Sequence, residues 1–104
     1  MKAVVTVTGK DNKGIIAKVS AFLAEKGANI EDISQTIMSE YFAMIMIVDL
    51  SETKEELSVL AKECQEMGKQ IGMAIYMQPQ PVSSINSISV MKSFLPKPKR
   101  ILHL

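Results

Sequence analysis

The spacing of apolar residues along the chain switches between the alternation typical of strands and the three-to-four-residue repeat typical of helices. Residues 2–8 carry mostly β-branched side chains and predict a strand. One face of a helix is then predicted by the recurring residues Ile15, Ile16, Val19, Phe22 and Leu23. Gly27 lies just after this helix, at a position where a glycine commonly ends one.

The middle of the chain predicts a hairpin of two strands. Residues 28–38 have a weaker strand pattern, and the short turn 39–40 leads into residues 41–50, which are apolar on both faces. A strand that is apolar on both faces suits the centre of a sheet that is covered on both sides. Because the turn is so short, the two strands are expected to pair antiparallel.

A second helix and a last strand complete the pattern. Thr53 and Glu56 have the spacing of a capping box, which predicts that the helix begins there. Residues 72–78 form the last predicted strand. The helix carries one apolar stripe, made of Leu57, Leu60, Ala61, Cys64, Met67 and Ile71.

The order β-α-β-β-α-β predicts a ferredoxin-like α+β fold. In this fold, two helices cover one face of a four-stranded antiparallel sheet. The other face is left open, and an apolar face of that size is unfavourable in water. We therefore expect a homodimer, or a tail folded across the open face.

Length and charge divide the chain into two segments. Its 104 residues suit one domain. Residues 1–78 carry eight lysines and eleven acids, a net charge of −3, whereas residues 79–104 carry four basic residues and no acid. The prolines at 79 and 81 interrupt any strand, and residues 83–95 are interpreted as a possible short helix. We predict a domain over 1–78 and a basic Pro- and Ser-rich tail over 79–104.

Residue types used in common enzymatic and metal chemistry are scarce. The only cysteine, Cys64, lies on the apolar stripe of the second helix and is interpreted as a buried core residue. The only histidine, His103, lies in the tail. No CxxC motif, histidine pair or acidic calcium loop is present. We predict no catalytic residue, no metal site and no cofactor.

Nucleic-acid and membrane partners are also disfavoured. RNA-binding modules of this topology stack bases on aromatic residues of the central strands, and here only Tyr41 and Phe42 stand at the start of one such strand. No apolar run approaches the ~18 residues of a spanning helix, and the first residues lack a signal-peptide pattern. With a single cysteine, which suits a reducing compartment, the expectation is a cytoplasmic protein.

One loop has the chemistry of a small-anion site. Residues 9–14 offer backbone N–H groups at the start of the first helix, a position that favours a carboxylate. Asp11 can accept a hydrogen bond from a ligand ammonium group, and Asn29, which opens the second strand, is expected at the same end of the sheet. The alternative is that Asp11 or Asn12 only caps the helix and Asn29 only turns the chain.

Over residues 2–78 the chain resembles the ACT domain family. The resemblance rests on residues 5–16, 27–30, 32–35 and 44–49, together with Val19 and Phe22-Leu23. It is strongest to small stand-alone single-domain members similar to the glycine cleavage system regulator. It implies the same ferredoxin-like fold, and regulation rather than catalysis.

The resemblance also implies a ligand site. ACT domains usually bind amino acids or similar small effectors, commonly between the first strand–helix loop of one subunit and the second-strand region of another. Lys13 stands where many members have proline, and residues 79–104 match no part of the family pattern. Carried over by position, the site residues are Asp11, Asn12, Lys13, Gly14, Ile15, Asn29 and Ile30.

Two functions therefore remain open. The first is a non-catalytic regulatory module that binds a small effector, an amino acid in the family pattern, at a homodimer interface and signals to an unidentified downstream protein. The second is a ligand-free module for protein–protein interaction or dimerisation, which uses the open sheet face or the tail.

Overall fold

A computed structural model describes residues 1–80 of the chain. The predicted tail, apart from its first two residues, and the helix predicted over 83–95 lie outside the described residues. The six elements have the predicted order. They are β1 (Lys2–Lys10), α1 (Ile15–Glu25), β2 (Asn29–Met38), β3 (Tyr41–Asp49), α2 (Leu57–Ile71) and β4 (Met73–Pro79).

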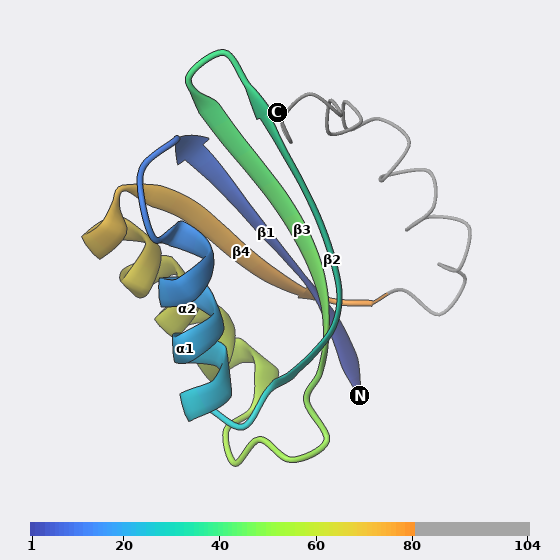
Figure 1. The fold of residues 1–104 in the computed structure, drawn as a ribbon. Coiled ribbons are helices and arrows are strands. Elements are labelled where there is room, and N and C mark those ends of the chain that lie inside the picture. The colour runs from blue at the N-terminus through green and yellow to red at the C-terminus, as the bar shows by residue number, and fades with distance from the viewer. Residues whose placement is uncertain (81–104) are drawn as a thin grey trace.

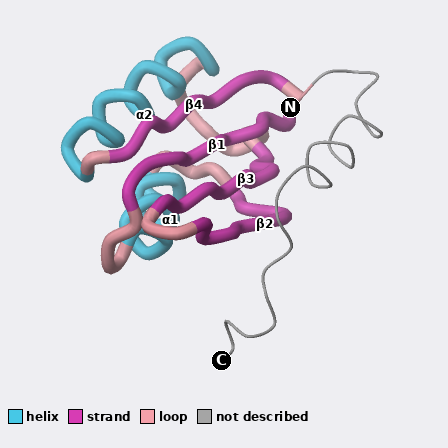
Figure 2. The backbone as a smooth tube through the Cα atoms, turned by 90° about the horizontal axis from the view of Figure 1, so that it is seen from above, coloured by secondary structure: helices cyan, strands magenta, loops and turns pink. Residues whose placement is uncertain are grey.

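The four strands form one antiparallel sheet in the order β2-β3-β1-β4. Both helices lie on the same side of this sheet (Figure 1). Seen from above, α2 runs beside β4 and α1 lies towards the other edge of the sheet (Figure 2). The predicted ferredoxin-like fold and the central position of the strand predicted over 41–50 are confirmed.

The main core fills the space between the sheet and the helices. Every second residue of a strand points to this side, as strand geometry requires. On the opposite face Val4 and Ile45 form a small second cluster against Ile47. No helix within residues 1–80 has the length and apolar character needed to cross a membrane. The core strands contribute Ala3, Val5, Val7, Phe42, Met44, Met46, Val48, Met73, Ile75 and Met77, and the helices add Ile15, Val19, Leu23, Leu60 and Cys64.

The end of α1 confirms the role predicted for Gly27. Its φ is 83°, in the left-handed region where a side chain is unfavourable. The N–H of Ala28 donates to the Leu23 carbonyl at 2.9 Å, and the N–H of Gly27 donates to the Ala24 carbonyl at 3.0 Å. This pair of bonds is a Schellman motif, and Ala28 and Leu23 are both buried beside it.

The capping box predicted at Thr53 and Glu56 is wrong. The Thr53 hydroxyl donates to the Leu50 carbonyl at 2.9 Å and so closes the loop after β3. Glu56 is the N-cap of α2, without a side-chain hydrogen bond, and the helix begins at Leu57. The helix therefore starts three residues later than the capping-box pattern implies.

Lys26 joins the end of α1 to α2. Its ammonium group lies 3.1 Å from the Glu63 carboxylate and 3.4 Å from that of Glu55. The same nitrogen lies 5.7 Å from the centre of the Phe22 ring. The hydrogen bond to Glu63 is the main cause that raises the pKa of Lys26. The ion pair therefore persists at neutral pH.

We expect Gly68→Ala to destabilise the protein. A Cβ at this position in α2 would lie 2.6 Å from the Met73 carbonyl oxygen and 2.9 Å from Cγ1 of Ile75. Alanine is intrinsically better than glycine in a helix by roughly 1 kcal/mol, but this overlap should reverse the sign and cost about 1–3 kcal/mol. Urea denaturation would measure the change.

Ser58→Ala on the exposed side of α2 is the matched control, because it adds no contact and should change stability by less than about 0.5 kcal/mol. A Gly68→Ala protein as stable as the wild type would contradict the close approach of α2 to β4.

Candidate functional site

The first turn of α1 is left without a side-chain cap. Gly14 is the N-cap residue, with a φ of 80°, and no side chain bonds to the helix start. The interpretation that Asp11 or Asn12 caps the helix is therefore wrong. Within residues 1–80 no acceptor pairs with the N–H groups of Ile15, Ile16 and Ala17. These three donors are free to bind an anion.

The loop before α1 is held against the β2–β3 hairpin. The N–H of Asp11 donates to the Glu40 carbonyl at 2.7 Å, which extends the pairing of β1 with β3 by one step. Lys10 and Glu40 also form an exposed ion pair of 3.5 Å, and such pairs add little stability. The backbone bond therefore fixes the position of Asp11 beside the end of β2.

A hollow of about 210 Å³ lies between this loop, the start of α1 and the end of β2. Of the predicted site residues, it brings together Asp11, Asn12, Gly14 and Ile15. Lys13 is exposed in the same loop and does not line it. Among the described residues the Asp11 carboxylate has no ion pair or side-chain hydrogen bond. The lining is Asp11, Asn12, Gly14, Ile15, Ile16, Ala17, Gln35, Ile37 and Phe42.

Asn29 and Ile30 lie at the other end of the sheet, so the expectation that Asn29 shares an end with the loop is wrong for a single chain. Asn29 pairs with Asp49 at the end of β3, whereas the loop lies next to Tyr41 at its start. At ~3.3 Å per residue the two ends are roughly 27 Å apart. The reason is that β1 and β2 both run antiparallel to β3 and are parallel to each other.

Asn29 has polar surroundings of its own. With Gly27, Asp49, Ser51 and Glu52 it lines a hollow of about 200 Å³. The Asp49 carboxylate accepts hydrogen bonds from the Ser51 hydroxyl at 2.5 Å and the Ser51 N–H at 2.9 Å. These bonds are the main cause that lowers the pKa of Asp49. Asn29 itself has no side-chain partner among residues 1–80.

The alternation of hydrogen bonds between neighbouring strands shows which residues of β2 have free backbone groups at the sheet edge. Asp11 N–H donates to Glu40 O and Leu50 N–H to Met1 O, so odd residues of β1 bond to even residues of β3. Successive residues of an antiparallel strand bond to alternate neighbours. Odd residues of β3 therefore bond to even residues of β2. The residues of β2 whose N–H and C=O groups point outward, with side chains on the helix side, are Ile33, Gln35 and Ile37.

Sequence reasoning misses five lining residues of the first hollow, Ala17 among them. The apolar pattern assigns Ile16 and Phe42 to the helix and the core, and Gln35 and Ile37 to a weak strand. The signal that could have found Gln35 and Ile37 is topological. In a β-α-β unit with parallel strands, the end of the second strand lies beside the loop that comes after the first.

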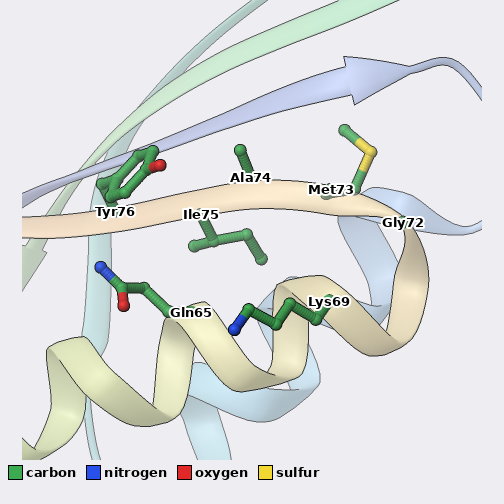
Figure 3. Close-up of a pocket in the computed structure, with 7 residues that line it drawn as sticks. All are labelled: Gln65, Lys69, Gly72, Met73, Ala74, Ile75 and Tyr76. Atoms are coloured by element: carbon green, nitrogen blue, oxygen red, sulfur yellow. The ribbon is translucent and has the colours of Figure 1, made fainter.

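A larger hollow of about 390 Å³ lies at the opposite edge of the sheet, between α2 and β4. Figure 3 shows Gln65 extending from α2 towards the strand, Lys69 lying along the helix with its ammonium group on the side of Gln65, and Ile75 pointing to the helix. Lys69 is the only charged residue among its lining side chains. It therefore offers a partner for an anion and no acidic group for a cation.

Residues 1–80 contain no group of His, Cys, Asp and Glu side chains that could hold a metal ion. Cys64 is buried in the core, as predicted. Burial is the main cause that raises the pKa of its thiol to about 11. A buried protonated thiol is a poor nucleophile.

We expect Cys64 to resist alkylation by iodoacetamide at pH 8 in the native protein and to react fully in urea. Because the pKa of the folded thiol lies above that of the unfolded one, its contribution to stability should also be lost as pH rises from about 9 towards 11. Mass spectrometry of labelled protein measures the first effect. Rapid labelling of the native protein at pH 8 would contradict the burial of this thiol.

Comparison with known proteins agrees with the fold. The sequence model of the ACT domain matches residues 2–78. A UPF0237 protein of Clostridium acetobutylicum is 49% identical over 85% of this chain and 100% of its own length. The solved ACT domain protein from Streptococcus pneumoniae is 45% identical, with a TM-score of 0.69 over 75% of this chain and 88% of that one.

A formyltetrahydrofolate deformylase from Pseudomonas syringae has a TM-score of 0.68 over 75% of this chain and 27% of that one. At 22% identity this likeness shows the fold alone. The extent of the domain match and the identity to the relatives carry the assignment: this chain belongs to the ACT domain family.

Proposed function

We propose that the chain is a non-catalytic regulatory module that binds an amino acid at the interface of a homodimer. The observation that carries this proposal is the hollow at the start of α1, where free N–H groups and the unpaired Asp11 carboxylate lie together. A free amino acid carries both a carboxylate, which suits the N–H donors, and an ammonium group, which suits Asp11. Its carboxylate accepts from the N–H groups of α1, and its ammonium group donates to Asp11.

The free edge of β2 supports a second copy as the partner. Ile33 and Ile37 are 39% and 41% exposed, and their outward backbone groups have no partner within residues 1–80. An unpaired edge of this kind is a template for another strand. If two β2 strands pair antiparallel with Gln35 on the two-fold axis, Ile33 lies opposite the partner's Ile37, and the reverse. Each of these exposed apolar side chains then lies beside an apolar side chain of the partner.

The same pairing supports Asn29 and Ile30 as site residues contributed from the other subunit. Because two such strands run in opposite directions, the start of one β2 lies beside the end of the other. The partner's Asn29 is then close to the hairpin that holds Asp11. In this proposal each site takes Asp11, Asn12 and the start of α1 from one copy, Lys13 borders it, and Asn29 and Ile30 come from the other.

Thermodynamic linkage between ligand binding and dimerisation provides the regulation in this proposal. A ligand that contacts both copies binds the dimer and not the monomer, so its concentration controls the fraction of dimer. We propose that an unidentified downstream protein recognises the dimer. A cytoplasmic location fits this role, because the single buried Cys64 suits a reducing compartment.

We expect one or a few of the common amino acids to raise the melting temperature of the full chain. At about 100 times its dissociation constant a ligand adds about 2.7 kcal/mol, which is several degrees for a domain of this size. Asp11→Ala and Asn29→Ala should each abolish the shift and remain folded, because both side chains are exposed and unpaired. No shift with any amino acid would contradict the proposed function.

Mixing the two variants tests whether the site crosses subunits. A heterodimer of Asp11→Ala and Asn29→Ala chains has one doubly damaged site and one intact site, so binding should reappear at about a quarter of all sites after random re-association. The matched control mixes wild type with the double variant Asp11→Ala/Asn29→Ala, whose heterodimer has no intact site. Calorimetric titration measures the stoichiometry. Failure of the first mixture to regain binding would show that no site combines Asp11 of one copy with Asn29 of the other.

Ile33→Lys is expected to convert the dimer to monomer and to abolish effector binding. A lysine at the centre of an unpaired edge opposes strand pairing. Tyr76→Lys, which adds the same charge on the open face of the sheet at a side chain 50% exposed, should leave the dimer intact. Sedimentation equilibrium distinguishes them. If Tyr76→Lys dissociated the dimer and Ile33→Lys did not, the interaction through the open face would be the correct alternative.

A further inference from the structure

The hollow at the start of α1 has an apolar wall that a binding site for polar groups alone would not need. Ile16 of α1 and Ile37 of β2 are 37% and 41% exposed, whereas Phe42 of β3 is buried behind them. Large apolar side chains left half-exposed around one hollow favour an apolar occupant, because its burial removes their surface from water.

Polar and apolar groups occupy different sides of this hollow. Asp11, Asn12 and the free N–H groups belong to the loop and the first turn of α1, whereas Ile37 and Phe42 come from the sheet. A ligand held by its ammonium and carboxylate groups at the loop therefore directs its remaining substituent towards the sheet. Gln35 is the one polar side chain of the lining that comes from a strand.

The proposed pairing of two β2 strands would extend the apolar side. With Gln35 on the two-fold axis, the partner's Ile33 lies opposite Ile37 and faces the same side of the sheet. No charged side chain of the lining apart from Asp11 is available to hold a charged substituent.

We propose that the effector is an α-amino acid with a medium-sized apolar side chain, selected by Ile16, Ile37 and Phe42 against polar side chains of the same shape. This inference rests on the proposed function and names the ligand class of that site. The selection arises because a hydroxyl or amide group would lose its water against Ile16, Ile37 and Phe42, whose side chains offer no hydrogen bond in return.

Two pairs of free amino acids with matched shape test the proposal on the full chain. Valine and threonine differ by a methyl group in place of a hydroxyl, and leucine and asparagine by a branched apolar group in place of an amide. Calorimetric titration should give valine and leucine dissociation constants about ten- to a hundredfold lower than those of threonine and asparagine. Equal or tighter binding of the polar member in both pairs would overturn this inference and leave the proposed function standing.

A substitution at Ile37 tests whether this residue causes the preference for an apolar ligand side chain. Ile37→Thr keeps a β-branched residue in β2 and should reduce the valine-over-threonine preference severalfold or more. Val59→Thr is the matched control, because Val59 is 42% exposed on α2, outside the hollow, and should leave the preference unchanged. An unchanged preference in Ile37→Thr would contradict the role of this wall. If none of the twenty amino acids binds the wild-type chain, the proposed function fails and this inference fails with it.

Discussion

Hydrogen-bond alternation along β1, one of the two central strands, is the constraint on which the rest of this structure depends. Its odd residues bond to β3 and its even residues to β4, where Gln80 N–H donates to the Lys2 carbonyl. At both edges the free backbone groups therefore belong to residues whose side chains face the helices. The β4 edge and the β2 edge differ in how far a helix covers their side chains. The close approach of α2 at Gly68 buries Met73, Ile75 and Met77, whereas α1 leaves Ile33 and Ile37 half-exposed.

The difference between the edges determines where a partner strand can add. Pro79 has no N–H and lies at one end of β4, which shortens the segment available for pairing there. β2 has ten residues and no proline. The edge that is long and apolar is also the edge that ends beside the Asp11 loop, so the proposed strand pairing and the proposed ligand site involve the same part of the molecule.

Apolar periodicity predicts the six elements because each of them buries one face. A buried face requires an apolar residue at every second position of a strand and at every third or fourth position of a helix. The polar details are less predictable. Thr53 has the right spacing for a cap, but its hydroxyl bonds to the Leu50 carbonyl instead. The sequence pattern places Asn29 at the wrong end of the sheet, although the β-α-β order implies that β1 and β2 are parallel. The grouping of Ile16, Gln35 and Ile37 around one hollow depends on how far α1 extends over β2, which no local sequence pattern records.

A site shared by two copies makes a small ligand an effective switch. If neither half binds alone, each occupied site stabilises the dimer by its full binding term, and a symmetric dimer has two. At about 100 times the dissociation constant the two terms together reach roughly 5 kcal/mol, which changes the dimer dissociation constant by about four orders of magnitude. A domain with a modest interface can therefore pass from monomer to dimer over a narrow range of effector concentration. In the proposed dimer the separation of Asp11 and Asn29 to opposite ends of one chain would produce this steepness, because a site complete within one subunit would bind its ligand without any effect on assembly.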